Sequence, residues 1–87
     1  MPVISSFYGI SIKMYFQHSE HNPPHFHVIY KNAEAEVDIR TGMILAGSLP
    51  RKAEQLVREW ANLHRAELLQ IWETQVFIPL PPLERRR

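Results

Sequence analysis

The sequence predicts a single α+β domain, in which an antiparallel meander of about four strands is followed by one or two C-terminal helices packed on one face. Three observations predict this class. Apolar and polar residues alternate in the first half of the chain, turn residues separate the alternating segments, and apolar residues in the second half recur at helical spacing. A chain of 87 residues is long enough for one core and too short for two.

The first expected strands lie on either side of Gly9. Residues 10–16 alternate strictly between apolar and polar side chains, which is the pattern of a strand with one buried face. Residues 3–8 show a weaker form of the same pattern and are expected to form a short partner strand. Gly9 then provides the turn between the two strands.

Residues 26–30 and 33–39 are expected to form a hairpin around Lys31-Asn32, because Asn tolerates the positive φ of a tight turn. The apolar residues of both strands share a buried face only if residue 26 pairs with 37 and residue 28 with 35. This register places His25 opposite Asp38 and His27 opposite Glu36, on the face away from the core. A further turn at residues 40–42 leads to a last strand at residues 43–46.

Helical structure is expected after Ser48-Leu49-Pro50, because proline is tolerated in the first turn of a helix. Its sheet-facing side is expected to consist of Ala53, Leu56, Val57, Trp60 and Leu63. A second helical stretch, residues 67–74, carries Leu68, Ile71 and Trp72; it either continues the first helix or bends away near residues 62–64. Residues 1–76 are expected to form the domain, and residues 77–87 an extended, proline-rich tail that ends in three arginines.

The composition narrows the functional classes. The formal net charge is +1, and because Arg85, Arg86 and Arg87 supply three positive charges, the rest of the chain carries −2. The body of the protein is therefore not a general polyanion binder. Without cysteine, the strong metal ligands left are histidine and carboxylate. No apolar run approaches the length of a membrane span, so we expect a cytoplasmic protein with no membrane attachment.

Chemically active side chains are concentrated between residues 18 and 27, which contain four of the five histidines. His25 and His27 lie two apart on an expected strand and so share a face. With Asp38 and Glu36 orienting them, one imidazole could act as base and the other as acid. In RNA cleavage, a phosphate would then be held by binding residues drawn from His21, Lys13, Lys31 and Arg40. This chemistry requires no cofactor.

Two other interpretations of the same histidines stay open. A divalent transition metal could be bound by His18, His21, His25 and His27, although their spacing matches no diagnostic zinc signature. Alternatively, the histidines are ordinary polar residues on a solvated strand face, where they pair with the acidic strand opposite.

Four parts of the sequence, taken in order, are distinctive: the start Met1–Ile4, the run His21–Val28, the segment Gly47–Pro50, and the helical part with Trp60 and Trp72. Together they resemble an uncharacterised bacterial family, the domain of unknown function 4160. Members of this family look like small stand-alone proteins, often encoded beside another small protein, and such pairs have been proposed as toxin–antitoxin modules. The resemblance therefore implies a bacterial cytosolic setting and a small cognate protein partner. It singles out His21, His25 and His27 but implies no catalytic residue, substrate or cofactor.

These observations lead to two functional hypotheses from different classes. The first is a toxin-like component of a two-gene module, acting as a histidine-dependent ribonuclease through His25 and His27 with Asp38 and Glu36. The second is a non-enzymatic module, either an antitoxin-like partner-binding protein or a metal-dependent regulator. RNA is a partner under the first hypothesis, and an exposed sheet edge would permit a homodimer under either.

Overall fold

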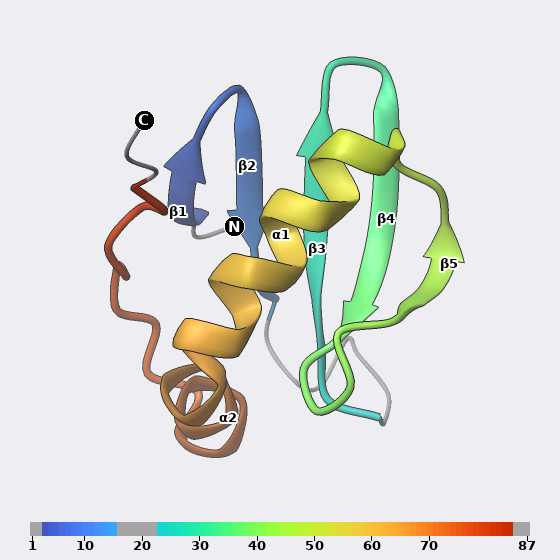
Figure 1. The fold of residues 1–87 in the computed structure, drawn as a ribbon. Coiled ribbons are helices and arrows are strands. Elements are labelled where there is room, and N and C mark those ends of the chain that lie inside the picture. Colours follow the sequence, from blue (N-terminus) through green and yellow to red (C-terminus); the bar gives the residue numbers. More distant parts are fainter. Residues whose placement is uncertain (1–2, 16–22, 85–87) are drawn as a thin grey trace.

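The computed structural model describes residues 3–15 and 23–84 (Figure 1). The described chain forms five strands and then two helices: β1 (Val3–Phe7), β2 (Ile10–Lys13), β3 (His25–Tyr30), β4 (Ala33–Asp38), β5 (Ile44–Gly47), α1 (Arg51–Leu63) and α2 (Arg65–Thr74). The predicted α+β class is confirmed. The strands number one more than the approximate four expected, because both short terminal strands, β1 and β5, pair with their neighbours.

The sheet is an antiparallel meander in the order β1-β2-β3-β4-β5, and α1 crosses one of its faces (Figure 1). The buried side chains of the sheet meet those of the helices there. Trp60 of α1, which has no exposed surface, packs against Phe26 of β3 and Phe7 of β1 at ring-centroid distances of 5.9 and 5.7 Å. The expected burial of Trp60 on the sheet-facing side of the helix is confirmed, and Trp72 is buried as well, since their exposed fractions are 0% and 3%.

The hairpin register agrees with the prediction at every pair. Phe26 lies opposite Val37, and the histidines at 25 and 27 lie opposite Asp38 and Glu36. In the turn, the positive φ of 53° belongs to Lys31. Burial of the apolar face fixed this register, because a slip of one residue would have exposed Phe26 and Val37.

The helical region bends, which settles the alternative that the sequence left open. α1 ends at Leu63, and the backbone N–H of His64 donates to the carbonyl oxygens of Trp60 and Ala61. Arg65 then donates from Nε to the Ile39 carbonyl oxygen at 3.0 Å, which ties the bend to the sheet. Leu63 was expected on the buried face, but the bend leaves its side chain 68% exposed. No helix among the described residues is long and apolar enough to cross a membrane.

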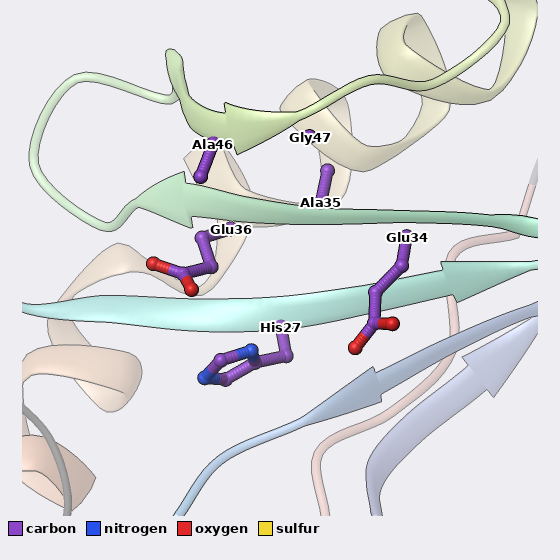
Figure 2. Close-up of a pocket in the computed structure, with 6 residues that line it drawn as sticks. All are labelled: His27, Glu34, Ala35, Glu36, Ala46 and Gly47. Atoms are coloured by element: carbon purple, nitrogen blue, oxygen red, sulfur yellow. The ribbon is translucent and has the colours of Figure 1, made fainter.

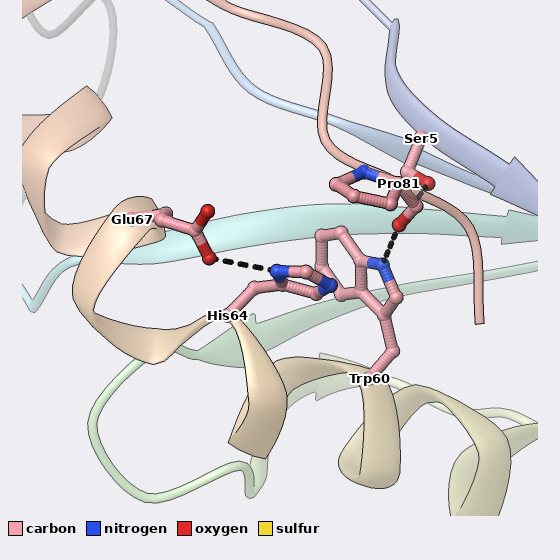
Figure 3. A network of polar contacts seen from close by, with 5 residues as sticks. All are labelled: Ser5, Trp60, His64, Glu67 and Pro81. Atoms are coloured by element: carbon pink, nitrogen blue, oxygen red, sulfur yellow. Dashed lines mark hydrogen bonds and ion pairs between the residues drawn. The ribbon is translucent and has the colours of Figure 1, made fainter.

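The segment after α2 packs along β1. The backbone N–H of Leu80 donates to the Ile4 carbonyl oxygen at 2.8 Å, and Leu80 and Leu83 are both buried in the core. The Pro81 carbonyl oxygen accepts two side-chain donors, Trp60 Nε1 at 2.9 Å and Ser5 Oγ at 3.3 Å (Figure 3). The domain boundary after residue 76 stays a prediction, but the chain beyond it contributes apolar side chains to the same core.

Candidate functional site

The candidate site lies on the face of the sheet opposite α1 (Figure 1), and Trp72 of α2 contacts this face at His25, at the start of β3. The registers place Lys13, His27, Glu36 and Ala46 in one row across β2, β3, β4 and β5. Strand alternation directs these side chains away from the core, and Figure 2 shows His27 and Glu36 on the side opposite the helices. The predicted pairing of His27 with Glu36 therefore lies near the middle of this face, which also carries Ile29 between Ser11 and Glu34.

His25 is held in place by the backbone that precedes it. Its Nδ1 lies 2.8 Å from the Pro23 carbonyl oxygen, and because a carbonyl oxygen only accepts, this nitrogen carries the proton. In the neutral ring the lone pair is then on Nε2, which lies 3.8 Å from Oε1 of Glu36. The ring packs against Trp72 at 5.3 Å and is only 6% exposed. One of the open interpretations placed both histidines on a solvated strand face, and for His25 it is wrong, because Trp72 of α2 packs against the ring.

Asp38 faces His25 in the register, but its carboxylate has another role. Its Oδ1 accepts hydrogen bonds from the backbone N–H groups of Arg40 at 2.7 Å and Thr41 at 3.3 Å. Asp38 therefore orders the turn after β4, and the carboxylate that approaches the His25 ring is Glu36, its diagonal neighbour. A side-chain oxygen two residues before free backbone donors commonly forms such a turn.

His27 is the more accessible of the two histidines. Its ring lies edge-on to Tyr15 at a centroid distance of 4.4 Å and 5.2 Å from the ring of His25. Tyr15 was not predicted to belong to the site. It could have been found from the alternating pattern, because it lies two residues after Lys13 and therefore shares its face. The rings of Tyr15, His27 and His25 therefore lie next to one another, near the end of β2 and the start of β3.

A shallow depression of about 240 Å³ opens beside His27. It is lined by His27, Glu34, Ala35, Glu36, Ala46 and Gly47 (Figure 2). Its polar groups are one imidazole and two carboxylates, and its wall towards β5 is low because the residues there are Ala and Gly. Such a lining favours a cationic ligand and disfavours phosphate.

The cationic side chains proposed to hold a phosphate are not gathered at this depression. Lys13 pairs with His27 in the register, but Lys31 lies in the turn before β4 and Arg40 in the turn after it. These two turns are at opposite ends of the sheet (Figure 1). Lys31 Nζ instead lies 5.3 Å from the ring centre of Tyr30.

The four-histidine metal site falls partly outside the described residues, because His18 and His21 belong to residues 16–22. Within the ranges that the structure describes, no group of three or more histidine or acidic side chains is arranged to hold a metal ion. The metal site and the participation of His21 stay predictions.

Comparison with known proteins gives one match. The model of a family described as Domain of unknown function (DUF4160) matches residues 9–73, which run from the turn before β2 almost to the end of α2. No curated protein and no solved structure matches the chain. The matched region contains the whole polar face described above and leaves out β1 and the segment that packs on it.

Proposed function

The chain belongs to this family of unknown function, and we propose that it is a non-enzymatic module that binds a small protein partner through the outer face of its sheet. We define the outer face as the side chains of Lys13, His27, Glu34, Glu36 and Ala46. The observation that carries the proposal is the lining of the depression, in which two carboxylates flank a partly exposed histidine on the face of the sheet opposite α1 (Figure 1).

The charge of the outer face determines which class of partner it attracts. Glu34, Glu36 and Asp38 alternate along β4, whereas Lys13 lies two strands away on β2, opposite His27. The field in front of the sheet is therefore negative, so it attracts a basic polypeptide segment and repels a nucleic-acid backbone. Partner binding of this kind accords with a role in a two-gene module, as either the toxin-like or the antitoxin-like component.

The test is a titration, measured by calorimetry, with the small cognate protein that the family resemblance implies. A Glu34→Gln/Glu36→Gln variant should bind at least tenfold more weakly than wild type, because both carboxylates of the depression are neutralised. The matched control is Glu73→Gln/Glu84→Gln, which changes the net charge equally at exposed positions on α2 and beyond it. If both variants weaken binding equally, or if neither weakens it, the outer face is not the binding surface.

A second candidate function, histidine-dependent RNA cleavage, is favoured by one specific observation. The His25 and His27 rings lie 5.2 Å apart, and the proton on His25 is assigned to Nδ1 by Pro23. One imidazole would take the proton of the ribose 2′-hydroxyl while that oxygen attacks the phosphorus. The other imidazole would give a proton to the departing 5′-oxygen, which leaves a 2′,3′-cyclic phosphate. The acidic surroundings and the burial of His25 weigh against this function.

Growth of a bacterial host separates the two candidates. If the chain cleaves RNA, its induction should arrest growth, and a His27→Ala variant at the same soluble level should not. If the chain is a binding module alone, both cultures should grow equally and purified protein should leave RNA intact. RNA cleavage by wild type that persists in His27→Ala would contradict the histidine mechanism.

A further inference from the structure

The two edges of the sheet differ in how they are covered. The edge formed by β1 receives the C-terminal segment, through the hydrogen bond from Leu80 to Ile4. The edge formed by β5 pairs with β4 on one side and has no strand on its other side within the described chain. β5 itself, Ile44–Gly47, contains no charged residue and no proline, and Leu45 is 44% exposed. Natural sheets often block an open edge with charged residues or proline, and β5 has neither. β5 is short and its pairing with β4 contains a β-bulge, so this edge offers pairing to a short segment and not to a long strand.

The open edge borders the depression. Ala46 of β5 lies opposite Glu36 in the register, and Ala46 and Gly47 form the wall of the depression on this side. Gly47 has a φ of +78°, and a Cβ there would collide with the Glu34 carbonyl oxygen, so this part of the wall must stay without a side chain. A side chain that arrives from beyond β5 therefore meets only one methyl group before it reaches the carboxylates.

The spacing between strands determines how long such a side chain must be to reach the carboxylates. Neighbouring strands lie about 4.8 Å apart, so a residue on an added strand, opposite Ala46, would have its backbone about 10 Å from that of Glu36. Short side chains do not cross this gap. Lysine and arginine have long apolar stems that could lie over the Ala46 methyl group and place a positive charge beside Glu36.

We propose, building on the proposed function, that an extended segment of the protein partner adds to β5 as a sixth strand and inserts a Lys or Arg into the depression beside Glu36. Backbone hydrogen bonds to the open edge supply the affinity, and the cationic side chain supplies the selectivity. The partner is thereby identified by its chemistry, as a segment in which basic and apolar residues alternate.

A short peptide tests this mode directly. The probe is a capped hexapeptide with the sequence Val-Lys-Val-Lys-Val-Lys, and the control probe replaces each Lys with Glu. The lysine peptide should bind wild type, slow the hydrogen exchange of backbone amides in β5, and bind at least tenfold more weakly to Ala46→Arg. In that variant the new guanidinium fills the depression and neutralises Glu36, whereas Ala46→Ser should bind as wild type does.

The outcomes separate the binding mode from the proposed function. Equal binding of both peptides, equal binding to Ala46→Arg, or unchanged exchange in β5 would overturn strand addition. If the partner protein still loses affinity for Glu34→Gln/Glu36→Gln in that case, the outer face remains the binding surface and only the mode is wrong. If that variant also binds normally, both proposals fail.

Discussion

The Nδ1 atom of His25 lies 2.8 Å from the carbonyl oxygen of Pro23, so the ring is bound to the backbone just before its own strand. With the ring held in this way, Nε2 lies 3.8 Å from Oε1 of Glu36, and the ring packs against Trp72 at a centroid distance of 5.3 Å. His25 and His27, which look equivalent in the sequence, therefore have different roles: the first is built into the domain, and the second is presented at its surface.

The difference predicts unequal effects on stability. His25→Ala removes a buried ring and its hydrogen bond, and should lower the free energy of unfolding by about 2–4 kcal/mol. His27→Ala removes a partly exposed ring and should cost about 1 kcal/mol or less. Urea denaturation of the two variants measures both values. Equal losses would mean that His25 is not the structural member of the pair.

The C-terminal segment should prove to be part of the folded domain. Leu80→Ala removes a buried side chain and should destabilise the protein by about 2–4 kcal/mol. Ile78→Ala is the matched control, because Ile78 is 48% exposed and its loss should cost less than about 1 kcal/mol. Thermal unfolding distinguishes the two, and similar melting temperatures for both variants would show that residues from 77 onwards are a separate tail.

The indole of Trp60 should link the C-terminal segment, which packs along β1, to helix α1. Trp60→Phe removes the donor to the Pro81 carbonyl oxygen and part of a fully buried ring system. We expect a loss of about 2–4 kcal/mol in unfolding free energy. Proteolysis should also become faster at the released segment before global unfolding, and unchanged cleavage there would argue against the link.

Glycine at position 47 should be less replaceable than glycine at position 9. Both have positive φ, +78° and +79°, but a Cβ at Gly47 would collide with the Glu34 carbonyl oxygen, whereas at Gly9 it would only touch the Tyr30 ring at 3.7 Å. Gly9→Ala should cost about 1 kcal/mol for the left-handed conformation alone. Gly47→Ala should cost clearly more and should shift the NMR signals of β4 and β5, and equal costs would contradict the close approach.

Periodicity and burial made much of the fold predictable from the sequence. The hairpin register followed from requiring Phe26 and Val37 to share the core, because a slip of one residue reverses both faces. The opposition of His27 to Glu36 follows from the same requirement. Local patterns of this kind depend only on residues close together in the chain.

Long-range contacts were not predictable in the same way. The burial of His25 depends on Trp72, which reaches it only because the helices bend at His64, where Nδ1 lies 2.7 Å from Oε1 of Glu67 (Figure 3). No periodic pattern indicates where that bend brings α2. The Asp38 carboxylate is a different case, because the contacts are local: it accepts from backbone N–H groups two and three residues further on instead of contacting the His25 ring that lies opposite in the register.

Histidine ring signals in NMR spectra report directly on whether a partner binds at the outer face. His27 lies on that face, and His64 lies at the helical junction against Trp60 at 5.2 Å, so the two rings report on opposite sides of the sheet. Ring carbon–proton signals are assigned with His27→Gln and His64→Gln variants and then followed during titration with the partner protein. If the partner binds at the outer face, the His27 signal should move and the His64 signal should not. A moving His64 signal with an unchanged His27 signal would place the partner on the helical side of the sheet and rule out binding at the outer face.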